Sequence, residues 1–221
     1  MSVKEPAYEQ SREPSGKGRH ATRGYAKGRA RRQEILHAAF RAFAEQGFRA
    51  TSMREIAEMV GLSQAGLLHH FSSKDELLEE VLRLRDEEQT AFIERFFQED
   101  SVDELDYLVR LVEGNSRQAG LVRLYTVLSG ESVSPGHPAQ PYFLERYAET
   151  RGRVEGHLRD ARDQGRIDAG ADLAAAASTI IAVMDGLQVQ WLLDPAAVDM
   201  RSAFRTFLDS YLRGLAPRPS R

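Results

Sequence analysis

The segment from Thr51 to Phe71, TSMREIAEMVGLSQAGLLHHF, predicts two short helices joined by a tight turn at 61–63. Ser52 and Glu55 have the spacing of a capping box, and Gly61 supplies the positive φ that such a turn needs. The pattern is typical of a helix-turn-helix, whose second helix enters the major groove of DNA. Many helical bundles also contain short helix pairs with glycine turns. Five residues would hold the two helices together: Ile56, Ala57, Val60, Leu62 and Leu67.

Residues 29–46 precede this segment and predict an amphipathic helix, because apolar side chains recur every three or four positions. Gly47 would end that helix as the residue after its C-cap. Residues 1–28 are rich in Gly, Ser, Pro and charge, so we expect a flexible basic arm. Residues 16–32 hold seven Lys or Arg and no acid. Such an arm either lies along DNA phosphates or a narrow minor groove, or is a solvated tail.

The chain beyond the segment is helical throughout. Ser73 and Glu76 repeat the capping-box spacing and open a helix expected from Lys74 to about Phe97. No stretch shows the alternation of a β-strand. The sequence therefore predicts an all-α fold of about nine helices. Its parts would be an N-terminal three-helix domain over 29–75 and a larger helical domain over 76–221. Later helices are expected near 102–115, 117–132, 139–165, 171–193 and 196–214.

Charge is unevenly distributed along the 221 residues. Residues 17–74 carry eleven Lys or Arg against four acids, whereas residues 75–221 have a net charge of −9. The basic part can attract a polyanion, although a solvated charged tail ahead of an ordinary domain is the simpler alternative. The absence of cysteine excludes disulfides, thiolate zinc sites and cysteine nucleophiles. The longest uncharged apolar run, 173–184, is shorter than the ~20 residues of a membrane span, so we expect a cytoplasmic protein without a membrane partner.

Residues 29–82 resemble the TetR family of bacterial transcriptional regulators. The resemblance implies a three-helix DNA-binding head, a larger helical body, a homodimer, and a small-molecule effector that changes the affinity for double-stranded DNA. The residues that carry it are Arg32, Ile35, Leu36, Ala38, Ala39, Phe43, Glu45 to Phe48, Thr51, Ser52, Arg54 to Ala57, Gly61 to Ser63, His70, Phe71, Ser73, Lys74, Leu77 and Leu78.

The recognition helix would run from Ser63 to about His70. Gln64 lies at its N-terminal end, where an amide can bond adenine through two hydrogen bonds. The resemblance places Arg54 at a base-contacting position and Lys74 at a phosphate-contacting position. Leu68 stands where the family often has a phosphate-binding Tyr, so that contact is absent or replaced by a thymine methyl. The complete predicted DNA-binding set is Thr51, Ser52, Arg54, Ser63, Gln64, Ala65, Gly66, Leu68, His69 and Lys74.

The helices after 76 would supply the effector site and the dimer contact. Apolar and amphipathic side chains of the middle helices are the expected pocket lining, although many of them will prove to be ordinary core. These are Tyr107, Leu111, Leu121, Tyr125, Phe143, Tyr147, Met184 and Trp191. The last two helices resemble half of a four-helix dimer interface, or else an intrachain core. The expected interface residues are Ile180, Leu187, Val198, Phe204, Phe207, Leu208 and Tyr211.

Other classes of function have weaker support. The nucleotide-binding, serine-hydrolase and zinc-protease motifs are missing, which argues against an enzyme with a DNA-binding head. The adjacent His69 and His70 have no acid in register, so neither a metal nor a cofactor is expected. An RNA- or membrane-binding structural dimer would need stacking aromatics or a basic lipid-facing helix. The resemblance implies a repressor, and a homodimer implies a pseudo-palindromic operator; an activator of the same fold is the alternative.

Overall fold

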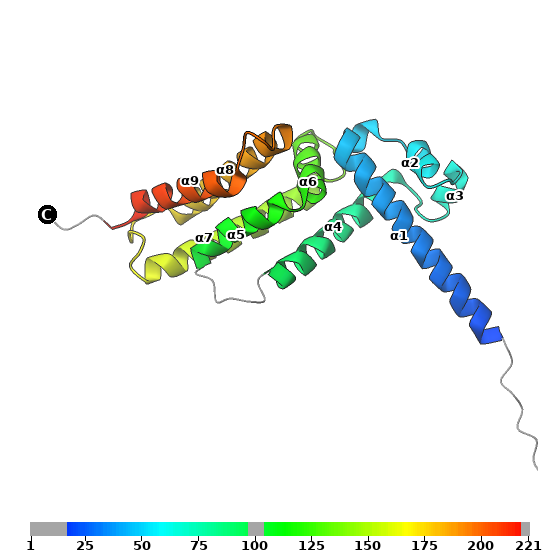
Figure 1. Ribbon diagram of the computed structural model, residues 1–221, viewed down its shortest axis with the longest axis horizontal. Coiled ribbons are helices and arrows are strands. Elements are labelled where there is room, and N and C mark those ends of the chain that lie inside the picture. Colours follow the sequence, from blue (N-terminus) through cyan, green and yellow to red (C-terminus); the bar gives the residue numbers. More distant parts are fainter. Residues whose placement is uncertain (1–16, 97–103, 218–221) are drawn as a thin grey trace, which may run out of the picture.

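A computed structural model describes residues 17–96 and 104–217, and all nine regular elements in these two ranges are α-helices (Figure 1). The all-α prediction is confirmed for this part of the chain. The head and the body lie at opposite ends of an elongated molecule. The elements are α1 (Lys17–Ala50), α2 (Met53–Met59), α3 (Gln64–Leu68), α4 (Lys74–Phe96), α5 (Glu104–Ser116), α6 (Ala119–Ser132), α7 (Gln140–Asp163), α8 (Leu173–Leu193) and α9 (Met200–Leu215).

The first helix differs most from its prediction. α1 begins at Lys17, so residues 17–28 are helical and the expectation of a flexible segment there is wrong. No proline interrupts 17–46, and an established helix extends at little cost once its first turn has formed. Residues 1–16, the rest of the expected arm, lie outside the described residues. At the other end the backbone leaves helical geometry at Gly47, with φ 82° and ψ 169°, which is close to the predicted end.

The predicted caps position the helix pair. Ser52 Oγ accepts from the backbone N–H of Glu55 at 3.2 Å, and the Glu55 carboxylate accepts from the N–H of Ser52 at 2.7 Å, which confirms the capping box. Gly61 has φ 65°, as the turn requires. At α4, Ser73 Oγ accepts from Glu76 N at 3.0 Å, but the Glu76 carboxylate bonds Ser72 and not Ser73. That second box is therefore only half formed.

Two apolar cores hold the molecule together. The first core is formed by the four helices of the head, α1, α2, α3 and α4, together with residues of α6 and the start of α7. Its largest fully buried side chains include Phe43 and Phe71. The second belongs to the body and is formed by α5, α7, α8 and α9 around Phe204. α1 and α6 make the most extensive helix–helix contact between head and body. The head therefore packs against the body mainly through the contact between α1 and α6.

α8 and α9 lie side by side at the end of the molecule away from α3 (Figure 1). Ile180, Phe204 and Leu208 are at most 2% exposed and belong to the core of their own subunit, so their assignment to a dimer interface is wrong. Helical periodicity identifies an apolar face but not which neighbour covers it. The other four expected interface residues are half-buried: Leu187, Val198, Phe207 and Tyr211.

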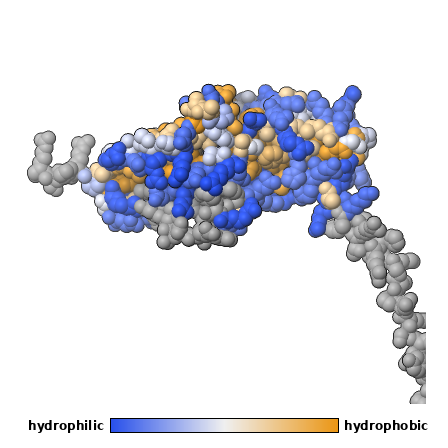
Figure 2. All heavy atoms as spheres, in the orientation of Figure 1, coloured by the Kyte–Doolittle hydropathy of each residue, from blue (hydrophilic) through white to orange (hydrophobic). Residues whose placement is uncertain are grey.

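Surface hydropathy is mixed on the face shown in Figure 2, where apolar residues gather at the edge over the junction of α8 and α9. Two large apolar side chains near this junction are exposed, Val189 at 44% and Leu193 at 82%. Among the described helices, α8 is the one long and apolar enough to cross a membrane by length and composition, and core helices of soluble proteins pass the same test.

Candidate nucleic-acid interface and effector cavity

α3 presents an exposed face at the tip of the head. Leu67 is fully buried and anchors the helix, whereas Gln64, Ala65 and His69 are exposed and Leu68 is 41% exposed. Ser63 caps the helix, because its Oγ accepts from the backbone N–H of Gly66 at 3.1 Å. The structure thus brings most of the predicted recognition residues onto one accessible surface.

α2 adds a cation and a hydroxyl beside that surface. The side chain of Arg54 is 77% exposed, and its Nε donates to Glu58 Oε1 at 2.8 Å. Hydrogen bonding to Glu58 raises the pKa of Arg54, so the guanidinium stays charged. An exposed ion pair of this kind contributes little to stability, so a phosphate or a base can replace Glu58 at little cost. Ser52 is exposed at the N-terminus of the same helix.

Thr51 does not belong to this surface, which corrects the sequence-based prediction. Its side chain is 2% exposed, and its hydroxyl donates to the carbonyl of Gly47 at 2.7 Å. The hydroxyl therefore ties the end of α1 to the start of α2 and is not available to a phosphate. The resemblance in sequence did not distinguish this structural threonine from a contacting one.

Lys74 is less free than a phosphate-contacting lysine is expected to be. Its Nζ lies 4.2 Å from the centroid of the Phe48 ring, a cation–π distance. Partial burial lowers the pKa of Lys74, and Glu131, Asp75 and Glu55 oppose that shift. The Phe48 ring therefore orients the ammonium at the start of α4.

A carboxylate of the body holds the end of α1. Glu131, in the last turn of α6, accepts from the backbone N–H of Phe48 at 2.6 Å and from that of Arg49 at 3.4 Å. A Cβ on Gly47 would collide with this carboxylate, which gives Gly47 a second role besides its positive φ. His137 lies next to the pair, with Nε2 3.7 Å from Glu131 Oε2 and its ring edge against Phe48. Sequence analysis missed this contact because its partners are more than eighty residues apart.

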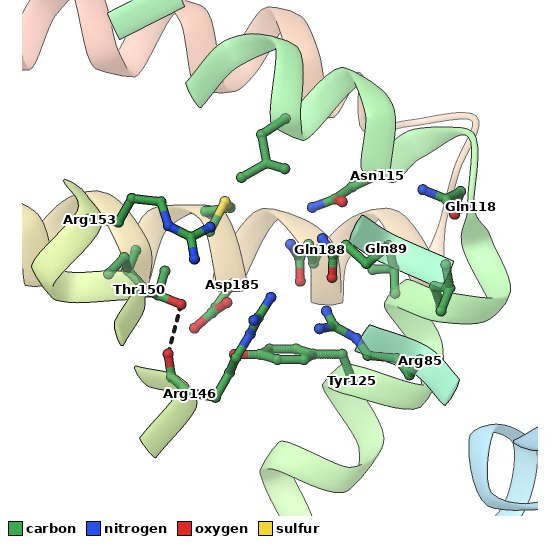
Figure 3. Close-up of a pocket in the computed structure, with 15 residues that line it drawn as sticks. Arg85, Gln89, Asn115, Gln118, Tyr125, Arg146, Thr150, Arg153, Asp185 and Gln188 are labelled. Atoms are coloured by element: carbon green, nitrogen blue, oxygen red, sulfur yellow. Dashed lines mark hydrogen bonds between the residues drawn. The ribbon is translucent and has the colours of Figure 1, made fainter. Parts of the chain in front are cut away.

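The body contains a cavity of about 60 Å³ between α4, α5, α6, α7 and α8, and its lining is shown in Figure 3. Four predicted pocket residues contribute to it: Leu111, Leu121, Tyr125 and Met184. The lining is far more polar than the sequence suggested. Sequence analysis considered only apolar and aromatic side chains and so missed the polar ones: Arg85, Gln89, Asn115, Gln118, Arg146, Thr150, Arg153, Asp185 and Gln188.

The other four predicted pocket residues lie elsewhere. Phe143 and Tyr147 border a separate surface hollow, and the Tyr147 hydroxyl donates to the cavity residue Asp185 at 2.8 Å. Tyr107 packs its ring 5.4 Å from that of His157, and Trp191 packs against the body core. None of these four lines this cavity, so their assignment to its lining is wrong, and Tyr147 contacts it only through Asp185.

Comparison with known proteins agrees with this architecture. Residues 35–81 match the family described as bacterial regulatory proteins, tetR family. Residues 139–217 match the C-terminal domain of BetI-type transcriptional repressors, and together the two matches cover more than half of the chain. The chain belongs to the TetR family. Its head and its body each match a domain of that family, in the expected order.

Relatives of this TetR-family chain match it either over a short segment at high identity or over most of its length at low identity. It is 48% identical over 54 residues to the transcriptional repressor KstR2 of Mycobacterium tuberculosis, a match that spans 24% of this chain and only 27% of the relative. It is 26% identical over 204 residues to the transcriptional regulator TtgR of Pseudomonas putida, which covers 86% of this chain and 93% of the relative. High identity is confined to a short segment.

Solved structures of TetR-type proteins share the fold. Salmonella enterica GusR superposes with a TM-score of 0.64 at 28% identity, over 83% of this chain and 96% of that chain. A transcriptional regulator from Saccharomonospora viridis in complex with choline gives a TM-score of 0.68 at 23% identity, over 85% of this chain and 98% of that chain. The second likeness establishes the fold alone.

Proposed function

We propose that the protein is a ligand-responsive transcriptional regulator, acting in the cytoplasm as a repressor that binds a pseudo-palindromic operator as a homodimer. The observation that carries this proposal is the exposed face of α3, with Gln64 at its N-terminal end and Leu67 anchored in the core. A helix presented in this way fits the major groove, where a Gln amide distinguishes adenine. Several relatives, KstR2 among them, are transcriptional repressors, which supports the direction of regulation.

Within this proposal the head, about residues 29–75, divides its contacts into two kinds. Gln64, Leu68 and Arg54 face base edges, whereas Ser52 and Lys74 contact phosphates of the flanking backbone. Phosphate contacts fix position and base contacts give specificity. The neighbouring basic side chains of α1 add attraction for DNA in any sequence.

Dimerisation would use α8 and α9 of the body, about residues 76–221. The stacked rings of Phe207 and Tyr211, with centroids 5.3 Å apart, leave partly exposed apolar surface on α9. Leu187 and Val198 are similarly half-buried, and Val189 and Leu193 are exposed at the same end. A two-fold axis through this face would place two α3 helices on successive major grooves, which doubles the number of base pairs read.

Ligand binding in the cavity would be coupled to release from DNA through α6 and α4. α6 lines the cavity with Leu121 and Tyr125 and holds the end of α1 through Glu131. α4 lines the cavity with Arg85 and begins beside the head at Lys74. A ligand that prefers one spacing of the two heads shifts the population toward that spacing. A coupling free energy of about 1–3 kcal/mol changes the affinity for DNA about 5–150-fold.

Selection of bound duplexes from a random library tests this function. We expect an enriched inverted repeat with half-sites about 10 base pairs apart, and retardation of DNA flanking the protein's own gene in a gel. Lys74→Ala should weaken all sequences about equally. No enrichment of any sequence, or enrichment without an inverted repeat, would contradict the proposal.

A further inference from the structure

The cavity gathers three guanidinium groups from two helices. Arg85 comes from α4, and Arg146 and Arg153 come from α7, whereas Asp185 of α8 is the one carboxylate among the lining residues that the structure describes. Figure 3 shows these side chains converging on the same space. Three cations facing one carboxylate give the lining an excess of positive charge.

Arg85 is buried in this wall with an unused donor. The residue is 7% exposed, its Nη1 donates to Asp86 Oδ1 at 2.8 Å, and its guanidinium lies 4.8 Å from the Tyr125 ring centroid. Its Nε finds no hydrogen-bond partner within the described part of the chain, and neither does the buried Oε1 of Gln89. Leaving a buried donor unsatisfied is unfavourable, and more so for a charged group, so the site favours a ligand that supplies an acceptor.

The neighbouring acids do not cancel the positive charge. Asp86, behind the lining, is shared: it accepts from Arg85 and from the Tyr142 hydroxyl at 2.9 Å, and it lies 4.0 Å from Arg146 Nη1. Asp185 accepts from Tyr147, and burial raises the pKa of this carboxyl, although the Tyr147 hydrogen bond opposes the shift. Three guanidinium groups against these two acids leave one excess positive charge, and the three include Arg153, which is exposed to solvent.

The rest of the lining is apolar and limits the size of the ligand. Leu111, Leu121, Val122, Ile181 and Met184 form the hydrophobic part of the wall. A cavity of about 60 Å³ holds a few waters at roughly 15 Å³ of such volume each, or a ligand with few heavy atoms. The combination suits a small molecule with one anionic end and a short apolar end.

We infer that the effector is a small organic carboxylate, whose anionic group is held by Arg146 and by the free Nε of Arg85. A guanidinium binds a carboxylate through charge-assisted hydrogen bonds, which are about twice as strong as neutral ones. A quaternary ammonium would meet an excess of like charge and is excluded. The inference rests on the proposed function in taking this cavity as the effector site.

Calorimetric titration of the full chain tests the ligand class. The probes are carboxylates of two to six carbons, each paired with its primary amide, together with inorganic phosphate and tetramethylammonium. We expect saturable binding of at least one carboxylate, and at least about tenfold weaker binding of its amide. Binding of phosphate alone, of tetramethylammonium, or equal binding of acid and amide would overturn the inference.

Matched variants on one helix locate the site. Arg146→Met should weaken carboxylate binding about tenfold or more, whereas Arg151→Met, on α7 but outside the cavity lining, should leave it within about twofold. Equal effects of the two would place binding elsewhere. Arg146 is partly exposed, and an unchanged melting temperature of Arg146→Met separates lost binding from lost folding. DNA selection distinguishes failure of the ligand inference from failure of the proposed function. If an operator is selected but no carboxylate binds, only the ligand class is wrong. If no operator is selected, the proposed function is wrong.

Discussion

The tip of the head and the cavity of the body are both candidate binding sites, but they are built in opposite ways. The head places short side chains on the solvent side of α3 and fixes them through one buried leucine and local caps. The body collects charged side chains from α4, α7 and α8 around a small space, among which Arg85 is buried and Arg146 and Asp185 are half-buried. The first arrangement suits a large ligand approached from outside, and the second suits a small ligand that must be enclosed. The joint between them is Glu131.

The largest effect is expected from the body core. Phe204→Ala should lower the free energy of unfolding by about 3–5 kcal/mol, because this fully buried ring would leave a cavity. Phe207→Ala, one turn later on α9 and only half-buried, should cost less and should mainly weaken the dimer. Chemical denaturation and analytical ultracentrifugation measure both. Equal loss of stability in the two variants would contradict the separation of core from interface.

A pair of glycine variants tests how much the Glu131 contact between head and body contributes to stability. Gly47→Ala should lower the free energy of unfolding by about 2–3 kcal/mol. The backbone at Gly47 lies in a region that is favourable only to glycine, and the added Cβ would displace the Glu131 carboxylate from its hydrogen bonds. Gly61→Ala has a positive φ but open space around its Cβ, so it should cost only about 1–2 kcal/mol. Thermal unfolding gives the difference. A Gly47→Ala protein as stable as Gly61→Ala would show that Glu131 contributes nothing.

The outward-facing region is tested by Gln64→Ala. Loss of its amide should cost about 1–2 kcal/mol at one base pair per half-site and relax specificity there. Fluorescence anisotropy on operators mutated one base pair at a time provides the measurement. Met59→Ala, an exposed position at the end of α2 that lies outside the predicted DNA-binding set, serves as a control for general disturbance of the head. A uniform loss on all operators would assign Gln64 to the phosphate backbone.

The smallest expected effect is a pH dependence at the joint. Burial lowers the pKa of His137, although Glu131 opposes the shift, and Nδ1 accepts from the N–H of Ala139 at 3.2 Å. The unfolded chain then takes up a proton first, so the stability from neutral His137 is present above pH 6.5 and lost as pH falls. The melting temperature should fall between pH 7.5 and 5.5 more in the native chain than in His137→Gln. Parallel curves would contradict this, and His69→Gln is the control.

Sequence analysis predicted the head well because its determinants are local. Ser52, Glu55, Gly61 and Ser63 fix caps and turns within a few residues of themselves, and all four act as predicted. Periodicity could not show that Phe204 is buried within its own subunit, because the helices that cover it are far from it in the sequence. The polar cavity also arises from non-local packing. Charged residues such as Arg85 resemble solvated helix positions until α7 and α8 enclose them.

The central claim is that two exposed α3 helices, one from each subunit, enter successive major grooves. The chain has no cysteine, so Met59→Cys gives a single spin-label position that is exposed beside α3 and outside the predicted DNA-binding set. Pulsed dipolar spectroscopy on the protein bound to its selected operator should give one narrow distance distribution, within about 10 Å of the 34 Å that separates successive major grooves. Absence of dipolar coupling, or a label distance far from one helical turn on the operator, would contradict the account.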